Sequence, residues 1–167
     1  MEEIGLADVE KVPISVDKWS NNGSTFTIGG DAHKFKVNSY ASGATPKEGV
    51  TAEILFLDKG TMQDYEGVDA DGKIILVNVD QRADWWITYP TLEAEFQGAA
   101  AIMLANTGGF SEVSEDALNS NDFCGPVSIP SASISQADSK YIQGLLEKGP
   151  VMGTLKVDNE VKENGGT

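Results

Sequence analysis

The segment Gly72-Lys73-Ile74-Ile75-Leu76-Val77-Asn78-Val79-Asp80 decides the fold. From Ile74 to Val79 it is apolar at nearly every position, and a strand without polar alternation is covered on both faces, as in a sheet flanked by helices. Ala99 to Ala105 is a similar strand built of smaller residues. We predict that these two strands are parallel neighbours with a right-handed connection. Their predicted core residues are Ile75, Val77, Ile102 and Leu104.

The connection between these strands contains a predicted helix that begins at Pro90 or Thr91 and ends at Gly98. Proline is favoured in the first helical turn, and glycine suits a left-handed cap at the end. Leu92 and Phe96 are four residues apart and share one face of this helix. A second helix follows Ser135, its expected N-cap, and stops at Gly149-Pro150. Its predicted buried stripe consists of Tyr141, Ile142, Leu145 and Leu146.

The two ends of the chain predict further strands around this centre. Lys11 to Trp19 alternates as a strand does, Asn21-Asn22-Gly23 has turn chemistry, and Ser24 to Ile28 is the expected return strand of a hairpin. Val151 to Val157 is the expected last strand, and residues 159–167 are expected to form a flexible C-terminal tail. The predicted fold is α/β, a single domain over residues 1–158. It has a mixed, partly barrel-like sheet with two main flanking helices.

Composition narrows the classes of partner. The chain has 167 residues, with 12 Lys and Arg against 26 Asp and Glu, so its formal net charge is −14. Such a surface repels phosphate backbones, which makes nucleic acid an unfavourable partner. No apolar run reaches the roughly 20 residues of a membrane-spanning helix. Residues 1–10 are acidic where a signal peptide would be basic, and the single cysteine excludes an internal disulfide.

The residue types needed for catalysis are scarce. The chain has one histidine, His33, and no His-Glu-x-x-His motif, whereas a catalytic zinc needs at least three protein ligands. A Ser-His-Asp or Cys-His centre would need that same His33, and no Gly-x-Ser-x-Gly segment occurs. We therefore predict that the chain contains no catalytic residues, no metal ligands and no cofactor. His33 is expected to be a solvated loop residue and Cys124 a half-buried filler.

Two acidic segments raise the question of calcium. Asp69-Ala70-Asp71-Gly72 begins like a calcium loop, but its fifth position is the cation Lys73, so a tight turn is the better interpretation. A second acidic cluster lies in the long loop after the Ala99 to Ala105 strand. Hard oxygen ligands leave weak calcium binding open there. This cluster consists of Glu112, Glu115 and Asp116.

Aromatic residues supply the candidate contact surface. Three of them fall within five residues before the first helix, and two more lie in the long loop from Thr107 to Val127. Aromatic residues fill cores, but they also concentrate at interfaces. Both interpretations stay open, with at least one indole facing a groove bounded by the long loop. The candidate residues for binding a partner or substrate are Trp85, Trp86, Tyr89, Phe110 and Phe123.

Three segments in order carry a family resemblance: Gly72-Lys73-Ile74-Ile75-Leu76-Val77, Gly98-Ala99-Ala100-Ala101-Ile102 and Ile129-Pro130-Ser131-Ala132-Ser133-Ile134. With their spacing they resemble the protease-associated domain, a non-catalytic module attached to or inserted in many peptidases. Asp17-Lys18-Trp19 and Asp84-Trp85-Trp86-Ile87-Thr88-Tyr89-Pro90 resemble the form carried by bacterial zinc aminopeptidases. Many family members have a cysteine and a shorter aromatic segment at this point, and this chain does not.

The resemblance implies a swivelling β/β/α fold and a role as a lid or substrate-access module. It implies that the chain is a fragment of a larger extracellular or cell-surface zinc peptidase. Zinc would then lie only in the catalytic domain of that parent. The implied partners are the rest of the parent enzyme and its peptide substrate. The alternative is an independent peptide- or protein-binding module that uses the Trp85/Trp86 loop as its contact.

Overall fold

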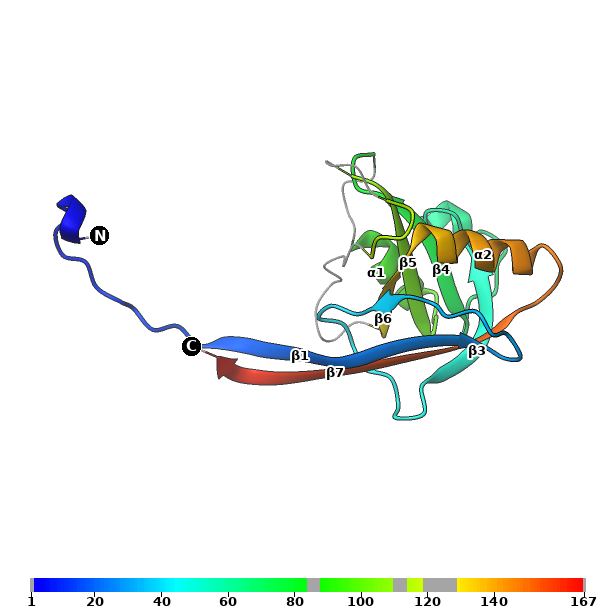
Figure 1. Cartoon of the computed structure of the whole chain (residues 1–167), viewed down its shortest axis with the longest axis horizontal. Helices are drawn as coiled ribbons and strands as arrows, with labels where there is room; N and C mark the ends of the chain where they lie inside the picture. Colours follow the sequence, from blue (N-terminus) through cyan, green and yellow to red (C-terminus); the bar gives the residue numbers. More distant parts are fainter. Residues whose placement is uncertain (1, 84–87, 110–113, 119–128, 167) are drawn as a thin grey trace.

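The structure is a computed structural model that describes residues 2–83, 88–109, 114–118 and 129–166. In this part of the chain, seven strands form one mixed sheet in the order β1-β7-β3-β4-β5-β6-β2, accompanied by two α-helices (Figure 1). The strands are β1 (Val16–Ile28), β2 (Val37–Asn38), β3 (Val50–Phe56), β4 (Ile74–Asp80), β5 (Ala101–Gly108), β6 (Ser131–Ile134) and β7 (Met152–Gly166). The helices are α1 (Tyr89–Phe96) and α2 (Gln136–Leu146), with short 3-10 helices η1 (Glu2–Ile4) and η2 (Met62–Tyr65).

The centre of the sheet is parallel, as predicted. β3, β4, β5 and β6 run in one direction, and Ile75 pairs with Ile102 while Val77 pairs with Leu104. All four of these side chains are fully buried. The prediction of two neighbouring parallel strands with two-sided cores is confirmed.

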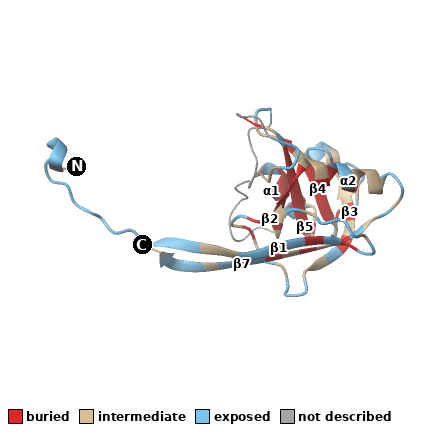
Figure 2. Ribbon diagram, in the orientation of Figure 1, coloured by how far each residue is buried: buried red, intermediate tan, exposed pale blue. Residues whose placement is uncertain are grey.

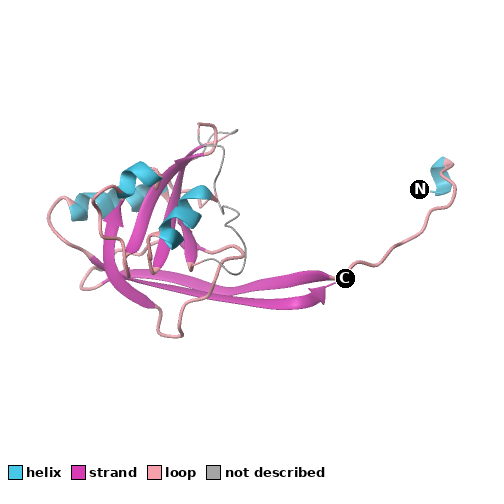
Figure 3. Cartoon of the chain, turned by 180° about the vertical axis from the view of Figure 1, so that it is seen from behind, coloured by secondary structure: helices cyan, strands magenta, loops and turns pink. Residues whose placement is uncertain are grey.

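The two helices cover opposite faces of this sheet (Figure 3). Successive residues of a strand point to opposite faces, so β4 and β5 each contribute to two cores. Ile75, Val77 and Leu104 pack in the same cluster as Ala94 of α1. Ile74, Leu76 and Met103 pack in the cluster that contains Ile142 of α2. The second cluster also takes in β1, β3 and β7, because the sheet curls into a nearly closed barrel, which confirms the predicted α/β fold class.

β1 and β7 form a long antiparallel ribbon that projects from the body of the molecule (Figure 1). The predicted hairpin around Asn21-Asn22-Gly23 is wrong, because β1 continues through these residues. Asn21 pairs with Asn159 and Ser24 with Val157, so β1 holds one extra residue there, a β-bulge. Gly23 takes the positive φ of 147° at this bulge. At this point the turn-forming residues therefore produce a bulge within β1 and do not end the strand.

The C-terminal segment continues the last strand. Residues 159–166 form the outer part of β7 and pair with β1 up to Val16 and Gly166. Most of this part is exposed (Figure 2), since a two-stranded ribbon has no second layer to cover it. At the root of the ribbon, the Asn159 Nδ2 donates to Ser39 Oγ at 2.9 Å and to the Ser42 carbonyl at 2.9 Å. Ser39 and Ser42 are buried, so this amide fastens the ribbon to the body.

The helix ends follow the sequence. Pro90 lies in the first turn of α1, and Gly98 beyond its last residue has a φ of +76°. The Ser135 Oγ accepts the backbone N–H of Asp138 at 3.1 Å and caps α2. Ile142 is fully buried as predicted, but Tyr141 is 38% exposed and does not belong to the buried stripe. Among the described residues, no helix is long and apolar enough to cross a membrane.

Candidate functional site

The carboxyl ends of β3, β4, β5 and β6 lie at one edge of the sheet, because these four strands are parallel. The predicted aromatic contact residues belong to the connections that leave this edge. Trp85, Trp86, Phe110 and Phe123 lie outside the described residues, so their predicted contact with a partner stays a prediction. Tyr89, the first residue of α1, is 42% exposed.

α1 turns its apolar residues outward. Beside Tyr89, its Leu92 is 42% exposed and its Phe96 is 84% exposed. These three positions follow the i, i+3, i+7 spacing of one helix face. The face toward the sheet instead carries Pro90, Thr91, Glu93 and Ala94. An amphipathic helix normally faces the core with its apolar stripe, so α1 is inverted with respect to the usual arrangement.

The layer between α1 and η2 is polar. Tyr65 of η2 is buried in the same cluster as Ala94, and burial raises the pKa of its hydroxyl, with the carboxylates of Glu93 and Asp64 raising it further. The Glu93 carboxylate accepts a hydrogen bond from the Gln97 side chain at 2.8 Å. Among the described residues, the buried hydroxyls of Tyr65 and Thr91 have no hydrogen-bond partner. The helix thus rests on the sheet through few apolar side chains.

The C-terminal end of α1 is acidic. Its last turn contains Glu95 and no basic residue. The Asp71 carboxylate lies beside Gly98, since a Cβ at that glycine would stand 2.6 Å from Asp71 Oδ1. Helix C-termini carry partial negative charge, so both carboxylates are placed where a cation would be favourable. Lys73, the cation of the adjoining turn, is engaged with Glu53 at 2.7 Å.

A second cluster joins α2 to the loop after β1, and the sequence did not predict it. The His33 Nε2 lies 2.7 Å from Asp138 Oδ1, and the His33 ring stacks on Tyr141 with centroids 4.1 Å apart. The Tyr141 hydroxyl donates to Asp31 Oδ2 at 2.8 Å. His33 is an exposed loop residue, as expected, but its ring is also held on two sides. His33 and Asp138 are 105 residues apart, and no local pattern connects them.

The electrostatics of this cluster are those of a structural clasp. The His33 backbone N–H, followed by the Tyr141 hydroxyl, lowers the pKa of the Asp31 carboxyl. The hydrogen bond to Asp31 raises the pKa of Tyr141. Nucleophilic catalysis needs a hydroxyl or thiol hydrogen-bonded to the base. In the part of the chain that the structure describes, the His33 ring nitrogen Nε2 lies within hydrogen-bond distance of the Asp138 carboxylate. The cluster ties the loop to α2 and offers no nucleophile.

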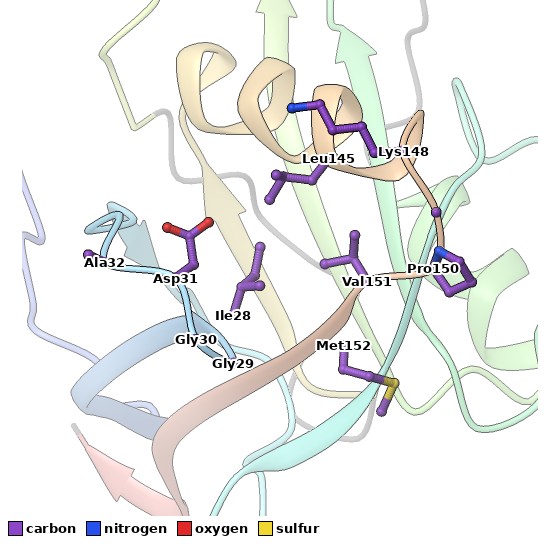
Figure 4. A pocket seen from close by; sticks show the side chains of 11 residues that line it. Ile28, Gly29, Gly30, Asp31, Ala32, Leu145, Lys148, Pro150, Val151 and Met152 are labelled. Carbon is purple, nitrogen blue, oxygen red and sulfur yellow. The ribbon is translucent and has the colours of Figure 1, made fainter.

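A hollow of about 470 Å³ opens beside this clasp, between the turn after β1 and the loop from α2 to β7 (Figure 4). Ile28, Leu145 and Val151 point into it. Asp31 and Lys148 stand at its rim, one from each side. Apart from Asp31 and Lys148, the residues that line the hollow are glycines and apolar residues.

The acidic segments do not assemble into a metal site in the described parts of the chain, where no group of three or more His, Cys, Asp or Glu side chains could hold an ion. Asp69 Oδ1 accepts the Asp71 backbone N–H at 3.3 Å, and Gly72 has a φ of +66°, as in a tight turn. Glu115 pairs with Lys140 of α2. Glu112 and Cys124 lie outside the described residues, so weak calcium binding at the second cluster stays a prediction.

Comparison with known proteins places this architecture among parts of larger peptidases. No protein-family model matches the chain. Carboxypeptidase Q of Bos taurus is 26% identical over 151 residues, which is 87% of this chain and 32% of the relative. The chain therefore spans about a third of the length of the curated relatives it matches.

Solved structures agree on the fold. A peptidase M28 precursor from Shewanella amazonensis SB2B superposes with a TM-score of 0.75 at 21% identity, covering 97% of this chain and 40% of that one. A zinc aminopeptidase from Bacillus subtilis superposes with a TM-score of 0.65 at 21% identity, covering 89% of this chain and 33% of that one. Nearly the whole chain thus matches a minor part of each larger protein.

Proposed function

We propose that this chain is a non-catalytic protease-associated domain of a larger zinc aminopeptidase, where it acts as a lid or substrate-access module. The observation that carries the proposal is the coverage: nearly all of the chain corresponds to about a third of each similar peptidase. A segment of that size, with its own two-sided core, is an accessory domain. The three sequence segments that resemble the protease-associated domain fall on β4, the start of β5 and β6.

The distribution of side chains supports a non-catalytic role. A catalytic zinc takes at least three protein ligands, and the single histidine of this chain is engaged with Asp138. Zinc therefore belongs to the catalytic domain of the parent enzyme. The partners of this domain are the rest of that enzyme and its peptide substrate, and its location is extracellular or at the cell surface.

The ribbon supports attachment at a single place. β1 enters the body and β7 leaves it as adjacent antiparallel strands, so both connections run side by side (Figure 1). Two neighbouring connections permit a domain to swing as a unit over an active site. A lid of this kind controls which peptides reach the catalytic centre.

The test has two parts. The purified chain, incubated with zinc, should hydrolyse neither aminoacyl-p-nitroanilides nor peptides, and it should retain no stoichiometric zinc after dialysis. The reading frame around this segment should encode a His-x-Asp motif followed by Glu-Glu and further ligands. Peptidase activity of the isolated chain, or a reading frame without metal-ligand motifs, would contradict the proposal.

A further inference from the structure

The outward face of α1 exposes apolar side chains on a domain whose formal net charge is −14. Tyr89, Leu92 and Phe96 expose apolar surface on one side of the helix, and Phe96 at 84% exposure is nearly as open as it would be in an unfolded chain. Single exposed apolar residues are ordinary on protein surfaces. Three on one helix face, opposite a buried face that contains Thr91 and Glu93, form a patch, and such patches mark interaction sites.

The carboxylates at the C-terminal end of α1 favour a partner that carries positive charge. Glu95 lies on α1 next to Phe96, and Asp71 lies beside Gly98 just past the helix end. Both are exposed, and the last turn of the helix has no basic residue to balance them. The partial negative charge of the helix C-terminus adds to the same spot. A cation near this end of α1 would be attracted by these exposed carboxylates and by the partial negative charge of the helix C-terminus.

We propose that the outward face of α1 is a docking surface for a cationic amphipathic segment of a partner protein. The apolar side of that segment covers Tyr89, Leu92 and Phe96. A lysine or arginine at its margin lies at Glu95 and Asp71. The proposal goes beyond the accessory role in a peptidase and does not depend on it.

Charge argues against the other occupants. A second copy of this chain would bring the same carboxylates together, and each copy already carries a net charge of −14. A membrane surface rich in anionic lipids would be repelled by the same carboxylates. A basic apolar segment gains from both features of the face, and it binds in the way that amphipathic helices use hydrophobic grooves and faces.

The experiment titrates the 167-residue chain with three synthetic peptides, observed through its backbone amide NMR signals. The first peptide has a leucine stripe at helical spacing and lysines elsewhere. The second has the same composition in an order without a stripe. The third carries glutamate in place of lysine. The first should bind saturably, with shifts confined to residues 69–72 and 88–98, and should weaken as salt is added.

Matched variants separate docking from general attraction to an acidic protein. L92S/F96S should weaken binding of the leucine–lysine peptide about tenfold or more, and E95Q about threefold. V12S/I14S removes two apolar side chains of 69% and 66% exposure elsewhere, and E147Q removes one charge at the end of α2. Both controls should stay within about twofold of the parent chain.

Several results would overturn the proposal. They are equal binding of the unstriped or glutamate peptide, equal losses in the control variants, and shifts outside the named residues. Absence of saturation up to about 1 mM peptide would do the same. Concentration-dependent dimerisation that L92S/F96S abolishes would make a second copy the occupant instead.

Discussion

α1 and α2 cover opposite faces of the same sheet but orient their apolar residues differently. α2 places Ile142 in the core beside the buried polar residues Asp138 and Ser139 and leaves Tyr141 exposed. α1 places Ala94, Thr91 and Glu93 inward and turns Leu92 and Phe96 toward solvent. The comparison teaches that helical spacing shows which residues share a face, but not which face packs on the sheet.

The largest expected effect on the free energy of unfolding comes from shortening the buried side chain of α2, compared with the exposed one of α1. Ile142→Ala removes a fully buried side chain from α2 and should lower the free energy of unfolding by about 2–5 kcal/mol. Phe96→Ala removes a larger side chain from α1 but should change it by less than about 0.5 kcal/mol, because that ring is already in water. Urea denaturation followed by circular dichroism measures both. Comparable losses in the two variants would show that the α1 face is covered within the chain itself.

Two glycines, one just after α1 and one inside α2, give a second contrast between the helices. Gly98 after α1 has a φ of +76°, and a Cβ there would stand 2.6 Å from Asp71 Oδ1. Gly98→Ala should cost at least about 1–2 kcal/mol, the penalty of a left-handed conformation. Gly144 lies inside α2 with nothing within 4 Å of the added Cβ. Gly144→Ala should stabilise the domain by about 0.5–1 kcal/mol, because alanine favours a helix interior.

Thermal unfolding of both variants checks these signs. Gly98→Ala should lower the midpoint and Gly144→Ala should raise it. A neutral Gly98→Ala variant would mean that the end of α1 rearranges at no cost, and that the position of Asp71 is not fixed by this cap.

Local signals in the sequence were sufficient for the centre of the fold. Ile74 to Val79 lacks polar alternation because both of its faces are covered, and Ser135 sits where a helix cap must be. The sequence predicts strands in both halves of the ribbon but not its full length, because the polar outer part has the composition of a loop. Asn22-Gly23 has turn chemistry, yet its strand partner lies far along the chain, so a bulge formed instead.

The candidate site was harder to predict, for two physical reasons. The pairing of His33 with Asp138 joins segments 105 residues apart, and sequence periodicity carries no such information. The orientation of α1 depends on what packs on its inner side, where the small Ala94 permits close approach to the sheet. Leu92 and Phe96 were correctly predicted to share a face, but the pattern does not say which way that face points.

The smallest expected effect concerns two helix tyrosines of similar exposure, Tyr141 on α2 at 38% and Tyr89 on α1 at 42%. Tyr141 donates to Asp31, which also accepts the His33 N–H, and these bonds lower the folded-state pKa of Asp31 below its usual 3.8. A carboxyl with a lowered folded pKa stabilises the protein above its unfolded pKa. That stability is lost as the pH falls through the folded pKa. The acid side of the stability curve should therefore steepen below about pH 4.

Asp31→Asn and Tyr141→Phe should each flatten that acid slope, while Tyr89→Phe makes the same chemical change on α1 and should leave it unaltered. Urea unfolding at a series of pH values from neutral to acid measures the slope. The shifted pKa of Tyr141 predicts a second dependence of stability on pH, in which stability is lost as the pH rises. The hydrogen bond to Asp31 raises its folded-state pKa above the usual 10, so its contribution is complete below pH 10 and disappears as the pH rises through the folded value. An acid slope that Tyr89→Phe flattens as much as Tyr141→Phe would show that the clasp on α2 is not its source. The two helices would then differ in how far their apolar side chains are exposed, and not in a contribution of their tyrosines to the acid slope.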